Sequence, residues 1–273
     1  MRRGIDNASV RPAAVAGLFY PDDASELRDV VARHLVETDV GDLPASPQAM
    51  IVPHAGYIYS GSVAAAAYSL VALRRHEIRR VVLIGPSHRV YLRGIALPEA
   101  DAFATPLGNI AIDREHRAML LADGDVVSAD APHAQEHCLE VQLPFLQMIL
   151  DDFTLLPLVV GAAAPRHVAR VLASVWGSED TLVLISSDLS HYHPYEMAQR
   201  IDRVTSDAIL RRATDLSGEQ ACGAACINGL LQLAQERQLN VTEVLRLNSG
   251  DTAGDRDRVV GYGAFAVHEA PLA

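Results

Sequence analysis

Histidines follow three short apolar segments of the chain, and imidazole is a common metal ligand and a group that gains or loses a proton near neutral pH. The segments, with the polar residues that follow them, are Ala49–Val52 with His54, Arg80–Ile84 with His88, and Thr181–Ser186 with Asp188 and His191. Parallel strands lie about 4.8 Å apart, so groups that leave one edge of a sheet can converge. The sequence therefore predicts one shared site for metal binding or proton transfer.

Each histidine also has an ordinary interpretation, because a single histidine in a turn is commonly a hydrogen-bonded surface or capping residue. The repeated occurrence at three predicted strand ends is what favours a joint site. Flanking residues indicate ordinary exposed positions for five other histidines, namely His34, His76, His116, His167 and His268. His133 and His193 are predicted to line the mouth of the pocket.

The third ligand of such a site must be anionic, since two histidines and one anionic group commonly hold a divalent metal with positions left open for oxygen, water or substrate. The candidates are Asp188, Glu136, Glu140 and the three cysteines. We favour Cys222, because it lies at the predicted start of a helix, where the helix dipole lowers the pKa of a thiol. Cys226 follows one helical turn later and could share that face, although a buried free cysteine more commonly serves only packing.

The segment Glu136-His137-Cys138-Leu139-Glu140 places two carboxylates on one face of a predicted helix. This E-H-x-x-E pattern resembles a metal motif, but we favour a supporting role. In that role a carboxylate accepts the second ring N–H of a ligating histidine and fixes its tautomer. The alternative is that these residues only cap a helix that begins at Ala134 or Gln135.

Short apolar strands that alternate with amphipathic helices must position this chemistry, a pattern typical of parallel strands buried on both faces. The predicted strands are Ala49–Val52, Arg80–Ile84, Gly94–Leu97, Gly108–Ile112, Thr154–Val160, Thr181–Ser186, Thr242–Leu247 and Gly261–Val267. The predicted helices are Asp22–Val36 with Asp23 as its cap, Gly61–Leu73, Glu136–Leu150, Pro165–Trp176, Glu196–Arg212 and Ala221–Arg237. We predict one α/β domain over residues 1–273, an α/β/α sandwich around a mostly parallel central sheet, with ligands beyond the carboxyl ends of its strands.

Composition excludes several function classes. The formal net charge is -11, which repels phosphate backbones and anionic lipids and disfavours nucleic acid as a partner. All 23 basic residues are arginine, so a Schiff-base lysine and a phosphate-loop lysine are both excluded. Three unevenly spaced cysteines predict no disulfide framework and favour a reducing compartment, for which we expect the cytoplasm. With no apolar leader and no apolar run of about 18 residues, we expect neither export nor membrane spanning.

Several separated motifs lie in one order along nearly the whole chain. They are Arg11-Pro12-Ala13 with Gly17–Pro21, Pro53–Gly61, Gly85–His88, Thr105–Gly108, Glu136–Phe145, Ser186–Tyr192 and Cys222-Gly223. Together these motifs resemble the Memo family, which includes the AmmeMemoRadiSam system protein B of bacteria and archaea. The resemblance implies a fold similar to that of the class III extradiol dioxygenases, the LigB-like group. It also implies a shared pathway with AMMECR-type and radical SAM proteins, which are the partners to expect.

The resemblance assigns roles to the five residues that we selected. His54 and His88 match the metal-ligand histidines, Cys222 matches a cysteine that stands where the dioxygenases have glutamate, and His191, with Asp188 beside it, matches the acid-base histidine. A thiolate is softer than a carboxylate, so it shifts the metal preference toward Fe(II), with copper or zinc as alternatives, and away from Mg(II).

Three functional hypotheses follow. The first is a non-haem Fe(II)-dependent redox enzyme, dioxygenase-like and of unknown substrate, in which His191 moves protons. The second is a non-catalytic protein that carries copper or iron, or that accepts a peptide or small polar molecule in the same pocket. A metal-independent hydrolase that uses Ser187 or Cys222 with His191 is weaker, because the chain has no G-x-S-x-G elbow.

Overall fold

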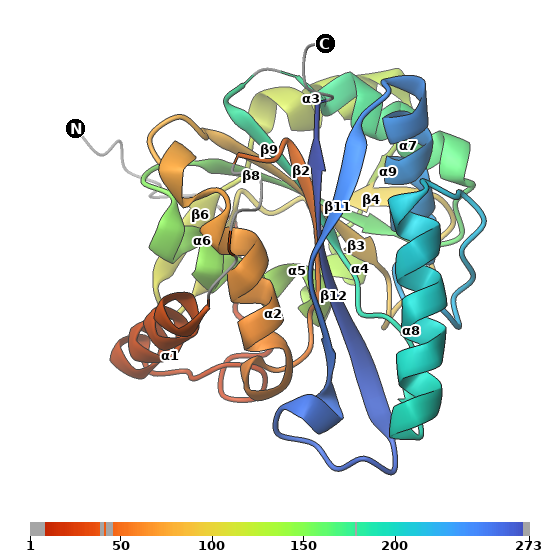
Figure 1. Ribbon diagram of the computed structural model, residues 1–273. Helices are drawn as coiled ribbons and strands as arrows, with labels where there is room; N and C mark the ends of the chain where they lie inside the picture. Colours follow the sequence, from red (N-terminus) through yellow and green to blue (C-terminus); the bar gives the residue numbers. More distant parts are fainter. Residues whose placement is uncertain (1–8, 39–40, 42–45, 178, 270–273) are drawn as a thin grey trace.

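A mixed β-sheet between two layers of helices organises the protein. The computed structural model describes residues 9–38, 41, 46–177 and 179–269, and across them the sheet has nine strands (Figure 1). Their order is β10 (His191–His193), β12 (Val259–His268), β2 (Ala49–Val52), β9 (Thr181–Ser186), β3 (Arg80–Pro86), β8 (Thr154–Val160), β4 (Ile95–Leu97) and β7 (Val127–Ser128), with β11 (Asn240–Asn248) paired to β12. The central strands β2, β9, β3 and β8 are parallel, whereas β12 and β4 run antiparallel to them.

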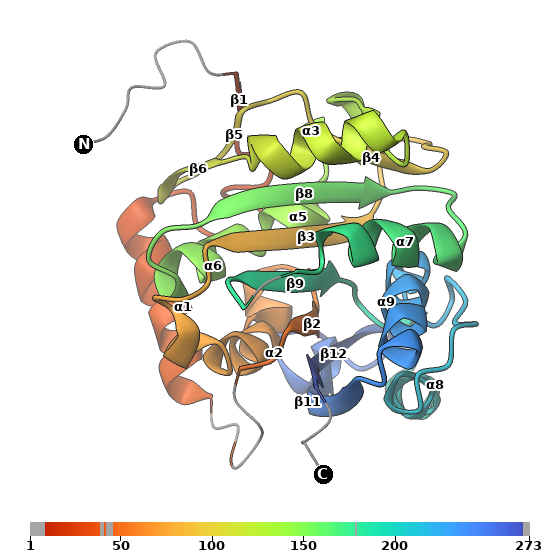
Figure 2. The same ribbon diagram turned by 90° about the horizontal axis from the view of Figure 1, so that it is seen from above.

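The central strands are buried on both faces, as their continuous apolar sequences predicted. In β3, Val81 and Leu83 belong to one hydrophobic core, and Val82 and Ile84 belong to the other. The first core is covered by α1 (Ala24–Glu37), α2 (Tyr57–Ser69), α5 (His137–Glu140) and α6 (Leu143–Ile149). The second is covered by α3 (Arg114–Asp123), α7 (Pro165–Val175), α8 (Tyr195–Leu210) and α9 (Ala224–Glu236) (Figure 2). The predicted α/β/α architecture is therefore confirmed.

Local sequence accounts for several helix boundaries. The Asp23 carboxylate accepts the backbone N–H groups of Ser25 and Glu26, so the predicted cap of α1 is confirmed. Pro165 stands in the first turn of α7, where its missing N–H has no partner to lose. Within the described ranges, no helix combines the length and the apolar run that crossing a bilayer would need.

A second, three-stranded sheet lies beside the main one. It consists of β1 (Val10–Arg11), β5 (Ala102–Thr105) and β6 (Gly108–Ala111), and β5 and β6 form a hairpin. The shorter helical pieces are α4 (Ala131–Ala134), η1 (Ala72–Arg74) and η2 (Ser249–Asp251). The sequence analysis predicted a strand near β6 but missed β5 and α3, whose segments are short and only partly apolar.

The predicted helix Glu136–Leu150 is wrong, because the segment forms the two short helices α5 and α6. Pro144 has no N–H to continue the helix, and its ring would clash with the carbonyl group four residues earlier. At the break, the Gln142 side chain turns inward, where its Nε2 donates to Pro53 O at 2.9 Å and its Oε1 accepts from the Tyr68 hydroxyl at 2.8 Å. These buried hydrogen bonds connect the break between the helices to Pro53, after β2, and to Tyr68 in α2.

Glu140 at the end of α5 anchors the N-terminal segment to the core. Its carboxylate accepts the Arg11 guanidinium at 2.6 Å and the Tyr20 hydroxyl at 2.6 Å. The backbone N–H groups of Ala14 and Val15 donate to the same carboxylate. Of the two carboxylates in the E-H-x-x-E segment, Glu140 therefore does not support a histidine, since all four donors belong to residues 11–20.

Replacing Glu140 tests this anchor. Glu140→Gln leaves the buried Arg11 charge without its partner and turns an amide N–H₂ group toward other donors. We expect the free energy of unfolding to fall by about 3–5 kcal/mol, as measured by urea denaturation.

The matched control is Glu77→Gln, which removes an exposed carboxylate paired with Arg74 at 3.2 Å. An exposed pair of this kind contributes about 1 kcal/mol or less. Equal losses in the two variants would contradict the anchoring role of Glu140.

Candidate metal centre

Three neighbouring strands place the predicted residues at one edge of the sheet. β9 lies between β2 and β3, and all three are parallel. His54, Asp188 and His88 follow β2, β9 and β3 closely in the sequence. Their side chains therefore leave the sheet side by side, as predicted.

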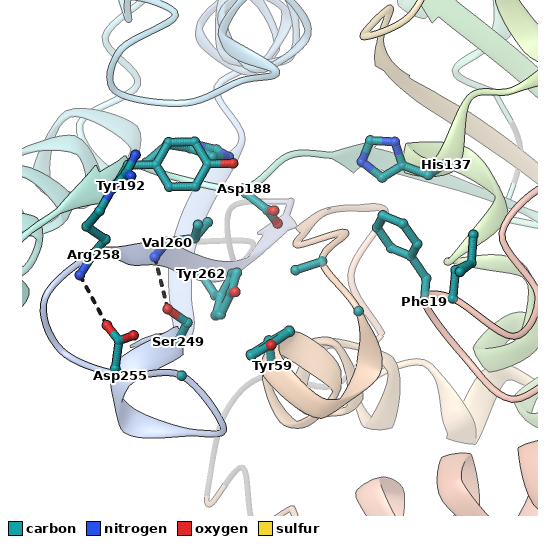
Figure 3. A pocket seen from close by; sticks show the side chains of 15 residues that line it. Phe19, Tyr59, His137, Asp188, Tyr192, Ser249, Asp255, Arg258, Val260 and Tyr262 are labelled. Atoms are coloured by element: carbon teal, nitrogen blue, oxygen red, sulfur yellow. Dashed lines mark hydrogen bonds between the residues drawn. The ribbon is translucent and has the colours of Figure 1, made fainter.

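Two adjoining cavities open at this edge. The first, called here the His/Cys pocket, has a volume of about 660 Å³ and is lined by His54, His88, His137, Asp188, His191, Tyr192, His193, Gly218, Glu219 and Cys222. The second, called the aromatic groove, has a volume of about 560 Å³ and extends between Phe19, Tyr59 and Tyr262 (Figure 3). Because four lining residues belong to both cavities, a ligand in the groove can reach the pocket.

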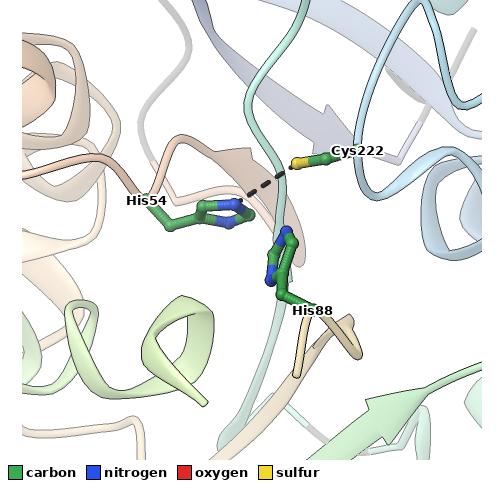
Figure 4. Close-up of side chains that lie close together, drawn as sticks. All are labelled: His54, His88 and Cys222. Carbon is green, nitrogen blue, oxygen red and sulfur yellow. Dashed lines mark hydrogen bonds between the residues drawn. The ribbon is translucent and has the colours of Figure 1, made fainter. Parts of the chain in front are cut away.

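His54, His88 and Cys222 converge in the first cavity. One donor atom from each lies within 4.8 Å of the other two (Figure 4). The Cys222 sulfur is 3.3 Å from His54 Nε2, and the two imidazole rings are nearly perpendicular, with centroids 5.2 Å apart. Metal–nitrogen bonds of about 2.0 Å and metal–sulfur bonds of about 2.3 Å place two donor atoms of one ion roughly 3–4 Å apart, and the Cys222–His54 distance matches this separation. The three side chains thus form a possible metal group.

A buried hydrogen-bond network determines which nitrogen of His54 faces this group. The Ser186 hydroxyl donates to Cys138 O at 2.6 Å and accepts from Gln142 Nε2 at 2.9 Å. His54 Nδ1, 2.9 Å from the same oxygen, must then be the donor, which leaves Nε2 unprotonated toward Cys222. Burial, together with the neighbouring His137 and His88 rings, holds the pKa of His54 well below its ordinary value, so the ring stays neutral.

Glu136 orients His88 in a similar way. Its carboxylate lies 2.9 Å from His88 Nδ1 and accepts the His88 backbone N–H at 2.7 Å. Burial alone would raise the pKa of Glu136, but the close approach of His137 Nδ1 and the hydrogen bonds from His88 outweigh it and bring the pKa well below its ordinary value. The ionised carboxylate accepts the Nδ1 proton and leaves His88 Nε2 free, as predicted. Glu136 also caps α5 by accepting the N–H of Cys138, so both predicted roles are present.

Cys222 stands before α9 rather than inside it. Its backbone N–H donates to Asp188 O, which holds the residue two positions ahead of Ala224, where the helix starts. Burial, followed by the charge of Asp188, raises the pKa of the thiol to about 12. The predicted lowering of this pKa by a helix N-terminus is therefore wrong. A cation at the site would be needed to ionise the sulfur near neutral pH.

Asp188 and His191 both line the pocket, but they do not hold each other. Asp188 accepts the His54 backbone N–H at 2.7 Å, and burial raises the pKa of its carboxyl group. His191 Nδ1 donates to Leu189 O at 2.8 Å, which directs Nε2 away from that carbonyl group. A backbone carbonyl group, and not the Asp188 carboxyl group, therefore orients the His191 ring.

His137 is a pocket residue that the sequence analysis did not select. Its ring lies 5.3 Å from that of His54 and 4.7 Å from that of His88, measured between centroids. Its Nδ1 is 3.2 Å from the Glu136 carboxylate, and its ring packs on Phe19. The E-H-x-x-E pattern includes His137. Its helical spacing, however, does not predict that the His137 ring lies beside the rings of His54 and His88.

The remaining predicted candidates take other positions. His193 lines the pocket as predicted, whereas His133 is buried and its Nε2 contacts Ala96 O, so its predicted place at the mouth is wrong. Cys226 is fully buried in the second core. Cys138 donates its thiol hydrogen to Pro86 O. Both cysteines therefore serve packing.

The fold has a counterpart among solved structures. An uncharacterized protein from Escherichia coli K12 superposes with a TM-score of 0.50 at 12% sequence identity, covering 80% of this chain and 98% of that one. At this identity the likeness concerns the fold alone.

Sequence relatives extend over almost the whole chain. A profile of the Memo-like protein family matches residues 11–266. A MEMO1 family protein of Aquifex aeolicus is 37% identical, over 93% of this chain and 97% of its own length, and one of Ignicoccus hospitalis is 36% identical over 93% and 97%. One of Metallosphaera sedula is 33% identical over 92% and 97%. The resemblance found in the sequence motifs is thereby confirmed, and the chain belongs to the Memo family.

Proposed function

We propose that this protein binds one Fe(II) ion through His54, His88 and Cys222 and uses it in redox chemistry on a small polar molecule. The observation that carries the proposal is the convergence of three donor atoms within 4.8 Å at the wall of an open cavity. The His54 ring is neutral, and in both histidines Nδ1 has a hydrogen-bond partner, so Nε2 is the nitrogen that faces the site. The Cys222 sulfur supplies a soft donor. Copper and zinc also accept such a donor set.

A catalytic role is favoured over metal carriage by the residues that face the cavity without being needed as ligands. His191, His137 and Asp188 line the same space. Bound there, Fe(II) would supply one-electron chemistry and open positions for oxygen and substrate. His191 Nε2, directed by the bond from Nδ1 to Leu189 O, is placed to accept or give a proton in the pocket. The Asp188 carboxylate balances positive charge on its neighbours.

Metal content tests the ligand set. We expect protein purified anaerobically to hold close to one equivalent of iron, copper or zinc by elemental analysis, and we expect His54→Ala and Cys222→Ser to abolish it, since each removes a donor. The controls are Cys226→Ala, which removes a buried thiol, and His76→Ala, which removes an exposed imidazole outside the pocket. If the wild-type protein holds no metal, even after anaerobic reconstitution, the proposed metal site is contradicted.

Glu136→Gln tests the support of His88. The neutral amide keeps the size of the side chain but removes the charge that holds the Nδ1 proton, so we expect metal affinity to fall about 10- to 100-fold in a chelator competition. Glu219→Gln removes an exposed carboxylate from the rim of the same pocket and should leave the affinity nearly unchanged. If the two variants lose affinity equally, Glu136 acts only through its charge at a distance.

His191→Ala separates an enzyme from a carrier. We expect this variant to keep its metal but to lower substrate-dependent oxygen uptake about 10²- to 10⁴-fold, because it removes the proton-transfer group. The measurement uses an oxygen electrode, iron-loaded protein and a panel of small polar molecules. If the wild-type protein is saturated with metal but takes up no oxygen with any molecule of the panel, the result favours a non-catalytic metal carrier.

A further inference from the structure

Tyr192 has a backbone conformation that bulky residues rarely adopt. It lies between His191 and His193 with φ of 61°, in the left-handed region. Its side chain is 62% exposed and lines both the His/Cys pocket and the aromatic groove. Strained residues of this kind persist where their surroundings hold them, and they cluster at ligand-binding sites. Tyr192, at the irregular pairing of β10 with β12, therefore presents its ring at the junction of the two cavities.

Arg258, from the turn before β12, lies over this tyrosine. Its guanidinium carbon is 5.0 Å from the centre of the Tyr192 ring, and it is the one arginine among the described residues that line the groove (Figure 3). The backbone N–H of Arg258 donates to Asp255, but within the described part of the chain its guanidinium group joins no ion pair. The fork of N–H donors is thus available to a ligand anion.

Aromatic side chains form much of the groove between Arg258 and the pocket. Phe19, Tyr59 and Tyr262 line it together with Tyr192. Phe19 also packs on His137, with ring centroids 4.8 Å apart, so the aromatic wall continues into the His/Cys pocket. Aromatic rings bind flat ligands by offset or edge-to-face contacts. The groove therefore fits a planar ring.

Charge in the groove limits the anion that it can take. Asp188 and Asp255 line it as well, and the chain carries a formal charge of -11. A groove with one guanidinium group and two carboxyl groups favours a ligand with a single negative charge over a phosphate dianion, since the second charge would add repulsion without a second cation.

We propose that the aromatic groove binds a planar carboxylic acid, with the carboxylate on Arg258 and the ring against Tyr192. The ligand's other end then points past Asp188 and His191 into the His/Cys pocket. Only this last statement rests on the proposed function; the carboxylate site stands on the groove itself.

Benzoate is the probe, and benzamide is its neutral match in shape. We expect calorimetry to detect benzoate binding at millimolar concentrations or below, with benzamide at least about tenfold weaker. Arg258→Gln should weaken benzoate binding by about tenfold or more and remove the preference over benzamide. The control Arg256→Gln makes the same charge change two residues away, where Arg256 lies over Tyr195 outside the groove, and should keep affinity within about twofold.

Two variants test Tyr192. Tyr192→Phe keeps the ring under Arg258 and should bind benzoate nearly as well as the wild type. Tyr192→Gly removes the ring and suits the left-handed backbone, so benzoate affinity should fall while the melting temperature does not. A lower melting temperature together with unchanged affinity would assign Tyr192 a purely structural role.

Several results would overturn the proposal. They are absence of benzoate binding, equal binding of benzoate and benzamide, unchanged affinity in Arg258→Gln, or stronger binding of phenyl phosphate than of benzoate. Repeating the titration on Cys222→Ser separates the two hypotheses, because benzoate should still bind to a protein that has lost its metal. If the metal-site proposal fails, the carboxylate-site proposal can therefore still hold. If benzoate does not bind, the metal-site proposal can likewise still hold.

Discussion

The hydroxyl group of Ser186 is the contact on which the site depends. It stands at the end of β9, donates to Cys138 O in α5, and accepts from Gln142 in the break between α5 and α6. These two bonds leave only an acceptor for His54 Nδ1, and they thereby turn Nε2 toward Cys222. The interruption of the helix at Gln142 is thus part of the site, because a continuous helix would carry that amide elsewhere.

Burial gives the acidic groups of this region different properties according to their partners. Glu140 accepts hydrogen bonds from four donors of residues 11–20 and thereby secures the N-terminal segment. Glu136 keeps its charge against burial because His88 and His137 surround it, so it can hold a ring proton. Asp188 has one backbone donor from His54, and burial raises its pKa. Carboxyl groups therefore act here as an anchor, as an orienting group and as a polar group that lines the open cavity.

Sequence reasoning succeeded where local pattern and chain order determine the structure. The strands Ala49–Val52, Thr154–Val160 and Thr181–Ser186 were predicted to the residue, since continuous apolar runs bounded by polar turns have few alternatives. Their carboxyl ends then place His54 and Asp188 together. It failed where distant segments meet. The ring of His137 reaches the site through the fold of α5, and Arg258 lies over Tyr192 only because β12 pairs with β10, a contact that no local spacing encodes.

Cys222 can approach the histidines because the residue after it has no side chain. A Cβ atom at Gly223 would lie 2.7 Å from Ser187 Cβ and 3.0 Å from Ser186 O, so any other residue would push the loop away from β9. The Gly223 N–H also donates to the Ser187 hydroxyl. The loop thus brings a thiol whose pKa is raised to about 12 close to the neutral imidazole of His54. An ionised sulfur there would be disfavoured without a cation, and a cation bound there would lack an anionic donor without the sulfur, so each stabilises the other.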